Sequence, residues 1–221
     1  MNVYFLLAFG FVSVLTFVVS LILSRSNYYE RFKMQFHFRN TFPYELNYNM
    51  RFKDNLFGNL CYVFSLVMLF IIGIGFNKKP NDIVMIFIMI SLFMVVLSNG
   101  LLMFIPLKYL KIHLASVILI FVSSFCLASL ICTQSFRIYQ ESKDVFSLFA
   151  LVVSALVALL IFILIMNPKL SKWAELENKT SSNGTSGYVR PKYFVLAFSE
   201  WILIFTSYIN LVGLLLLLFA Y

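Results

Sequence analysis

Six long apolar runs, separated by polar stretches, dominate the pattern of hydrophobic positions along the chain. The runs cover residues 3–23, 56–76, 83–105, 112–132, 145–166 and 194–219. Each is long enough to cross a hydrocarbon layer of about 30 Å as a helix. None alternates between apolar and polar residues as the strands of a membrane barrel do. The pattern predicts an all-α fold, a polytopic bundle of six membrane-spanning helices in a single integral membrane domain.

The composition agrees with a bilayer as the solvent of most of the chain. Of the 221 residues, 62% are hydrophobic and 12% are charged, and the mean hydropathy is +0.92. A water-soluble globule of 25.6 kDa has no interior large enough to hide so much apolar surface. The first run has no basic residue before it, so we interpret it as a retained span and not as a signal peptide.

Polar residues and prolines at the ends of the runs predict where the helices begin and end. Asp82 can cap the third helix and Asp144 the fifth, because a carboxylate accepts hydrogen bonds from free backbone N–H groups. Pro106 closes the third helix, and Pro168 closes the fifth.

The distribution of Lys and Arg predicts the orientation in the membrane. The loops at 24–55, 106–111 and 167–193 carry six, two and five of the 17 Lys and Arg residues, and the other two loops carry four. Basic residues concentrate in cytoplasmic loops. We therefore expect these three loops in the cytoplasm, both termini outside, and the plasma membrane as the location.

The loop at 167–193 also contains two tripeptides of the N-glycosylation pattern, beginning at Asn178 and Asn183. A glycosylated loop would lie outside the cytoplasm, against the charge distribution, so we interpret both as chance matches. We interpret the stretch 178–187 as a flexible surface linker.

The first loop is predicted to hold a short amphipathic helix at the membrane interface. Aromatic residues recur at helical spacing over 27–39, with basic residues among them. The simplest interpretation is an aromatic and basic belt beside two spans. The alternative is a docking surface for a partner protein or an anionic lipid. The residues of that candidate surface are Arg31, Lys33, Phe36, Arg39 and Tyr44.

Glu200 is the one ionisable residue well inside a predicted span, which makes it a candidate site because charges are costly in hydrocarbon. Polar residues at helical spacing after it predict a stripe that faces the bundle interior. Residues of other spans at similar depth would complete a polar layer around a vestibule open to the cytoplasm. The candidate intramembrane residues are Glu200, Asn99, Ser65, Ser116, Ser207 and Asn210.

Two alternatives stand beside this candidate site. Ser and Asn in spans often hold helices together by hydrogen bonds, and Glu200 is shallow enough to reach the interface or to pair with Lys192 or Arg190. His113, beside Lys111, is expected to be a solvated residue at a helix mouth.

The chain carries no motif for a catalytic centre, a metal site, a cofactor or a nucleotide. The two histidines are far apart in the sequence, and the three cysteines lack metal-ligand spacing. We therefore expect no catalytic residues and no cofactor. The net charge of +8 fits loops near anionic headgroups, not nucleic-acid binding.

Three functions are compatible with this sequence. The first is a small subunit or accessory component of a membrane transport or export system, acting through partners such as another membrane protein or an ATPase. The second is a structural or assembly protein without a substrate of its own. The third is a membrane-embedded enzyme that modifies lipids. Membrane lipids are expected partners in each case.

Overall fold

The computed structural model describes residues 3–48, 52–75, 82–170, 177–180, 186–189 and 191–220. The described residues form seven α-helices, three 3-10 helices and one pair of strands. The α-helices are α1 (Val3–Phe32), α2 (Glu45–Tyr48), α3 (Leu56–Gly75), α4 (Ile83–Phe104), α5 (Leu110–Ser142), α6 (Val145–Ile165) and α7 (Val195–Ala220). The 3-10 helices are Phe52–Asn55, Leu107–Tyr109 and Pro168–Leu170, and the strands are β1 (Glu177–Thr180) and β2 (Ser186–Val189).

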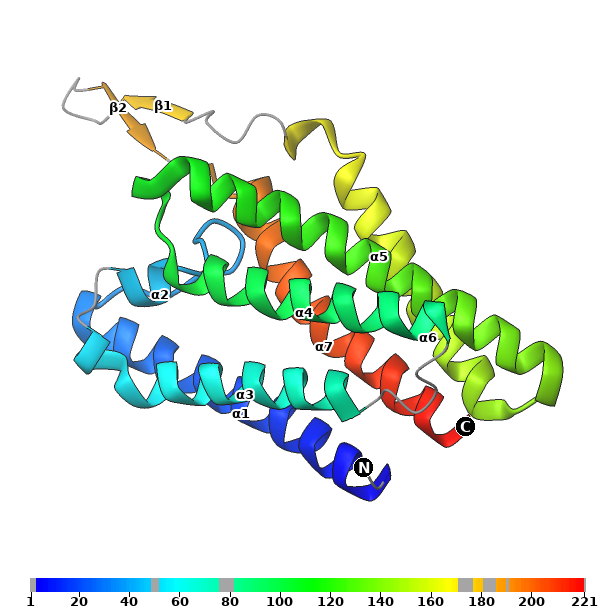
Figure 1. Ribbon diagram of the computed structural model, residues 1–221. Helices are drawn as coiled ribbons and strands as arrows, with labels where there is room; N and C mark the ends of the chain where they lie inside the picture. Colours follow the sequence, from blue (N-terminus) through cyan, green and yellow to red (C-terminus); the bar gives the residue numbers. More distant parts are fainter. Residues whose placement is uncertain are drawn as a thin grey trace.

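The predicted bundle of six membrane-spanning helices is confirmed. Among the described residues, six helices are long and apolar enough to cross a membrane, and only α2 is too short. Both ends of the chain lie at the same end of the bundle (Figure 1). The opposite end, where α1, α4 and α6 finish and α3, α5 and α7 begin, is called the loop end below.

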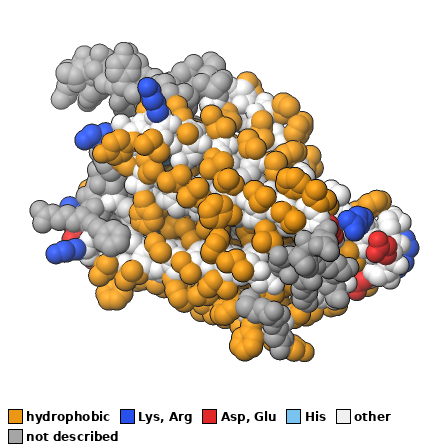
Figure 2. Space-filling model, in the orientation of Figure 1, with side chains coloured by type: hydrophobic (Ala, Val, Ile, Leu, Met, Phe, Trp, Pro, Cys, Tyr) orange, Lys and Arg blue, Asp and Glu red, His pale blue; other side chains and the backbone are white. Residues whose placement is uncertain are grey.

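Lipid-facing side chains cover the outside of the bundle. Large apolar residues on different helices are strongly exposed, such as Phe11 at 70%, Ile118 at 64% and Leu156 at 61%. Figure 2 shows hydrophobic side chains across the middle of the molecule and charged side chains toward its two ends. A soluble protein does not expose so continuous an apolar surface, so the chain is an integral membrane protein.

Helix α7 is the most buried of the six and organises the core. It packs against α1, α4, α5 and α6, and side chains from both of the protein's apolar clusters surround it. Trp201 and Tyr208 belong to one cluster, and Leu203 belongs to the other. Polar residues on α7 are therefore held deep inside the bundle.

The predicted helix caps are present in the structure. An Asp82 carboxylate oxygen accepts a hydrogen bond from the Val84 N–H at 3.0 Å, and Asp144 does the same for the Ser147 N–H at 2.8 Å. Helix α4 ends at Phe104, two residues before Pro106, as the sequence indicates. These local signals were sufficient to place three helix ends.

The predicted interfacial helix over 27–39 is wrong. Helix α1 continues without a break to Phe32, and Lys33 then adopts a left-handed conformation with φ of 54° that ends it. The residues that follow fold back against the bundle and are not helical until Glu45. The rings of Phe36, Phe42 and Tyr44 in this segment are buried in the bundle. Their burial stabilises the fold more than contact with the membrane surface would.

Two further predictions need correction. Helix α5 runs ten residues beyond the expected end at Cys132, because nothing between Thr133 and Ser142 interrupts a helix. The stretch 178–187 was predicted to be a linker, but β1 and β2 pair in antiparallel register, with Glu177 opposite Val189. The tripeptide that begins at Asn178 lies in β1, and the one that begins at Asn183 lies outside the described residues.

Candidate intramembrane ionisable site

A fully buried histidine and glutamate lie in contact near the loop end of the bundle. His113 is on the first turn of α5, and Glu200 is on the second turn of α7. The Nε2 atom of His113 lies 3.1 Å from Oε1 of Glu200, and both side chains have 0% exposure. The expectation that His113 is solvated is therefore wrong, and Glu200 pairs with it and not with Lys192.

The second ring nitrogen of His113 fixes the position of one proton. Nδ1 of His113 is 2.9 Å from the carbonyl oxygen of Ile105, which is left free at the end of α4. A carbonyl oxygen can only accept, so Nδ1 carries a hydrogen and donates it. Nε2 and Oε1 then share one proton, held either as an imidazolium with a carboxylate or as a neutral ring with a carboxylic acid. The pair is neutral overall in both arrangements, which limits the cost of placing it in a membrane.

The segment between α1 and α2 covers this pair. The rings of Phe42 and Tyr44 lie edge-on to the His113 imidazole, with centroid distances of 5.9 and 5.5 Å. Phe42 also packs edge-on against Phe194, just before α7, at 5.3 Å. The zero exposure of His113 and Glu200 leaves no water-sized space beside them, so the predicted vestibule open to the cytoplasm is absent at this site.

Hydrogen bonds hold the covering segment against α7. The indole Nε1 of Trp201 donates to the carbonyl oxygen of Thr41 at 2.8 Å. The Phe194 N–H donates to the carbonyl oxygen of Arg39 at 2.9 Å, and the Arg39 guanidinium donates to the hydroxyl of Tyr193 at 2.8 Å. The segment is therefore tied to the same helix that carries Glu200.

The other candidate polar residues form separate contacts deeper in the bundle. Asn99 Nδ2 donates to Ser207 Oγ at 3.1 Å, which joins α4 to α7. Ser65 Oγ and the hydroxyl of Tyr208 are 2.8 Å apart, and Ser65 also bonds to Ser13 on α1. These hydrogen bonds connect helices, as polar groups in membrane bundles commonly do.

Two candidates form no hydrogen bond to another helix among the described residues. The Ser116 hydroxyl donates to the Ile112 carbonyl oxygen within its own helix, at 2.8 Å. Asn210 is fully buried, and its amide nitrogen and oxygen have no hydrogen-bond partner among the described residues. The polar stripe on α7 does face the interior, but its members do not line one common site.

The candidate docking residues do not share one exposed surface. Phe36 and Tyr44 are 4% and 5% exposed, because their rings pack inside the bundle. Arg31 is partly exposed and forms an ion pair with Asp54. Lys33 and Arg39 remain exposed. The predicted surface is therefore wrong for its two aromatic members.

Sequence reasoning missed several residues that build the site and the deeper contacts, among them Thr41, Tyr62, Trp201 and Tyr208. The Tyr62 hydroxyl donates to the carbonyl oxygen of Asn99 at 3.1 Å. A tyrosine in the middle of a span needs a partner for its hydroxyl, and this signal was available for Tyr62 and Tyr208. No sequence signal marks Thr41, because its backbone carbonyl oxygen is the acceptor.

The described part of the chain contains no group of three or more His, Cys, Asp or Glu side chains placed to hold a metal ion. Comparisons with protein-family models, curated proteins and solved structures gave no match to this chain. Its function must be inferred from its own chemistry, of which the sealed His113–Glu200 pair is the most unusual part.

Proposed function

We propose that this chain is a membrane-embedded subunit of a transport or export system that acts through partners, with the His113–Glu200 pair as its ion-responsive element. The observation that carries the proposal is an ionisable pair with 0% exposure inside a membrane bundle. Replacing such a pair by apolar residues is often neutral or stabilising, so packing alone does not account for it. Ionisable residues inside membrane spans mark ion, proton and substrate sites more often than structural ones.

The covering segment between α1 and α2 connects the pair to the loop end, where a partner would bind. Loss or gain of the shared proton leaves a net charge between α5 and α7, which the low-dielectric surroundings disfavour. The rings of Phe42 and Tyr44 contact the His113 imidazole, so we expect them to move when water or an ion reaches that charge. A change of charge at the pair is therefore expected to move the segment that emerges at the loop end.

The charge distribution supports a cytoplasmic position for the loop end. The loops at that end contain 13 of the 17 Lys and Arg residues of the chain. In this orientation the segment over the pair faces the side where an ATPase or another cytoplasmic partner is available. The proposed location is the plasma membrane.

A structural or assembly role is the second candidate, and it has its own supporting observation. The Ser65, Asn99 and Ser207 side chains all bond to a neighbouring helix, as in a bundle whose polar groups only hold helices together. In that case the pair would be one more helix contact, and its charge would carry no function.

The test combines purification with a variant that keeps the shape of the pair. The tagged chain is purified from its native membrane in mild detergent, and we expect a second membrane chain or an ATPase in fixed stoichiometry. Glu200→Gln retains a hydrogen-bond donor toward His113 but removes the exchangeable charge. We expect Glu200→Gln to keep wild-type abundance and partner binding, and to fail to complement a deletion of the gene.

Ser199→Ala is the matched control, because Ser199 is a buried polar residue on the same helix that cannot ionise, and its hydroxyl donates only to the Val195 carbonyl oxygen within α7. It should complement at normal abundance. A chain that purifies alone would contradict the transport proposal. Equal complementation by Glu200→Gln and wild type would contradict the role of the pair and favour a structural function.

A further inference from the structure

A second unusual feature lies outside the sealed pair, in a groove between α1 and α7 at the loop end. A cavity of about 750 Å³ opens there, lined by α7, by residues 36–40 and by Arg25 of α1. A neighbouring cavity of about 710 Å³ shares Arg25, Phe36, Phe38 and Phe205 with it and extends along α1. Together they form one groove that runs from the polar end of the bundle toward its apolar side.

The polar end of the groove is positively charged. Arg25, Arg39 and Lys192 line the first cavity, and none of the residues that line either cavity is acidic. Among the described residues, no carboxylate forms an ion pair with any of these three cations. Their positive charge is thus available to a ligand.

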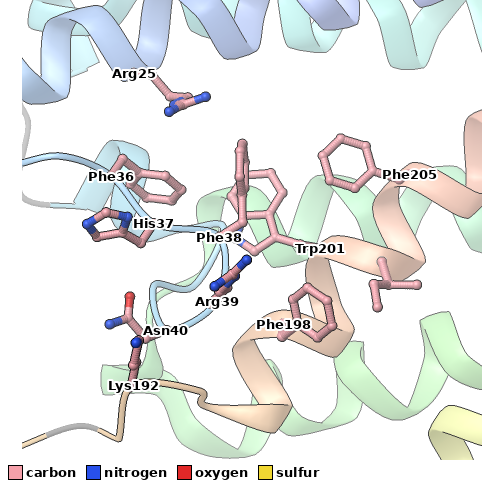
Figure 3. A pocket seen from close by; sticks show the side chains of 11 residues that line it. Arg25, Phe36, His37, Phe38, Arg39, Asn40, Lys192, Phe198, Trp201 and Phe205 are labelled. Carbon is pink, nitrogen blue, oxygen red and sulfur yellow. The ribbon is translucent and has the colours of Figure 1, made fainter.

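The cations are held over an aromatic wall. The Arg25 guanidinium lies 5.1 Å from the centre of the Phe38 ring, and the Arg39 guanidinium lies 5.1 Å from the Tyr193 ring. Figure 3 shows Arg25 reaching from α1 toward Phe38 and Trp201, with Phe198 and Phe205 projecting from α7. Contacts to rings orient these guanidinium groups without neutralising them.

The other end of the groove faces lipid. Val18 and Ile22 of α1 line the second cavity and are 44% and 63% exposed. Phe198 of α7 lines the first cavity and is 41% exposed. These side chains are part of the exposed apolar surface of the bundle, so we expect the groove to open toward the acyl chains of the bilayer.

We propose that this groove binds a membrane lipid with an anionic phosphate headgroup, held by Arg25, Arg39 and Lys192 while an acyl chain lies along α1 and α7. A guanidinium group donates several hydrogen bonds in a fork that fits phosphate oxygens. Uncompensated positive charge at headgroup level beside an apolar channel is complementary to a phospholipid and not to a soluble anion. This site does not depend on the proposed transport function, because it uses neither His113 nor Glu200.

The position of Trp201 allows a direct test. The chain has two tryptophans, and Trp173→Phe leaves Trp201 as the single tryptophan, in the wall of the cavity, so that its emission can be excited selectively over that of tyrosine. The full-length variant is reconstituted in phosphatidylcholine bilayers, and phosphatidylglycerol with dibrominated acyl chains is added in increasing mole fraction. Bromine quenches tryptophan only at short range. We expect quenching at a clearly lower mole fraction than with dibrominated phosphatidylcholine.

Charge removal then shows whether these residues hold the lipid. Arg25→Gln combined with Arg39→Gln should reduce the preference for phosphatidylglycerol by about fivefold for each charge removed. The matched control, Lys108→Gln combined with Lys111→Gln, removes two charges at the same end of the bundle but outside the groove. It should change the preference by less than about twofold, because the effect of a distant charge is screened.

Three results would overturn the proposal. Equal quenching of the wild-type chain by both brominated lipids would exclude a headgroup preference, and equal effects of the two double variants would indicate only general attraction to the surface. Displacement of the lipid by millimolar inorganic phosphate would indicate an anion site without lipid specificity. Lys192→Gln, at an exposed side chain, repeats the test with about a fivefold expected loss if the arginine variant does not fold.

Discussion

Replacing His113 with leucine is expected to lower the free energy of unfolding by about 3 kcal/mol or more. The substitution leaves Glu200 buried with neither carboxylate oxygen bonded, because Oε2 already lacks a partner among the described residues. It also removes the donor to the free Ile105 carbonyl oxygen at the end of α4. Both groups then lose hydrogen bonds, and at Glu200, which has 0% exposure, water cannot replace the bond.

The double variant His113→Leu with Glu200→Met is expected to recover most of this loss, because it removes both ionisable groups and retains their volume. Unfolding in mixed micelles, followed by circular dichroism, gives the four free energies of the double-mutant cycle. Ser116→Ala is the control on the same helix, and its effect should stay within about 1 kcal/mol, because only a hydrogen bond within α5 is lost. Additive losses in the cycle would mean that the two side chains do not interact.

Replacing Trp201 with alanine is expected to cost about 3–5 kcal/mol and to release the segment that covers the pair. The indole is 1% exposed and contacts the rings of Phe36 and Phe38, with centroid distances of 5.7 and 4.7 Å. It also donates the hydrogen bond to Thr41. Alanine leaves a large cavity at this junction and an unpaired backbone carbonyl.

The same micelle titration measures the loss of stability, and hydrogen exchange over residues 36–44 measures the release of the segment. Trp201→Phe keeps most of the ring contacts and loses only the donor, so a cost of about 1 kcal/mol is expected. Phe198→Ala, on the exposed side of the same helix turn, should leave the exchange of 36–44 unchanged. Unchanged protection of 36–44 in Trp201→Ala would contradict the role of the indole as the anchor.

The features that the sequence predicted are those encoded locally. An apolar run of about 20 residues spans a bilayer wherever it occurs, so the six helices followed from length and hydropathy. An aspartate before a run caps the helix through its own carboxylate, as Asp82 and Asp144 do. The inward orientation of Glu200 followed from the spacing of polar residues on one helix.

The features that the sequence did not predict depend on contacts between distant segments. His113 and Glu200 are 87 residues apart, and periodicity within one helix says nothing about which residue of another helix lies opposite. The sequence spacing of Phe36 is typical of an interfacial helix, but in the structure its ring packs against Trp201. Tertiary burial overrode the local amphipathic pattern there, as it often does for short segments.

The measurement that tests the central claim most directly is the accessibility of single cysteines in intact cells. The claim is a bundle of six crossings whose loop end, with the sealed pair and the cationic groove, faces the cytoplasm. In a background without Cys61, Cys126 and Cys132, the probes are Glu141→Cys at the end near the termini and Lys169→Cys at the loop end. Both side chains are exposed.

A maleimide that cannot cross membranes should label Glu141→Cys in intact cells and Lys169→Cys only after the cells are permeabilised. This result would place the 13 basic residues of the loop end on the inner side of the membrane. Labelling of Lys169→Cys in intact cells, or labelling of both positions from the same side, would contradict the account.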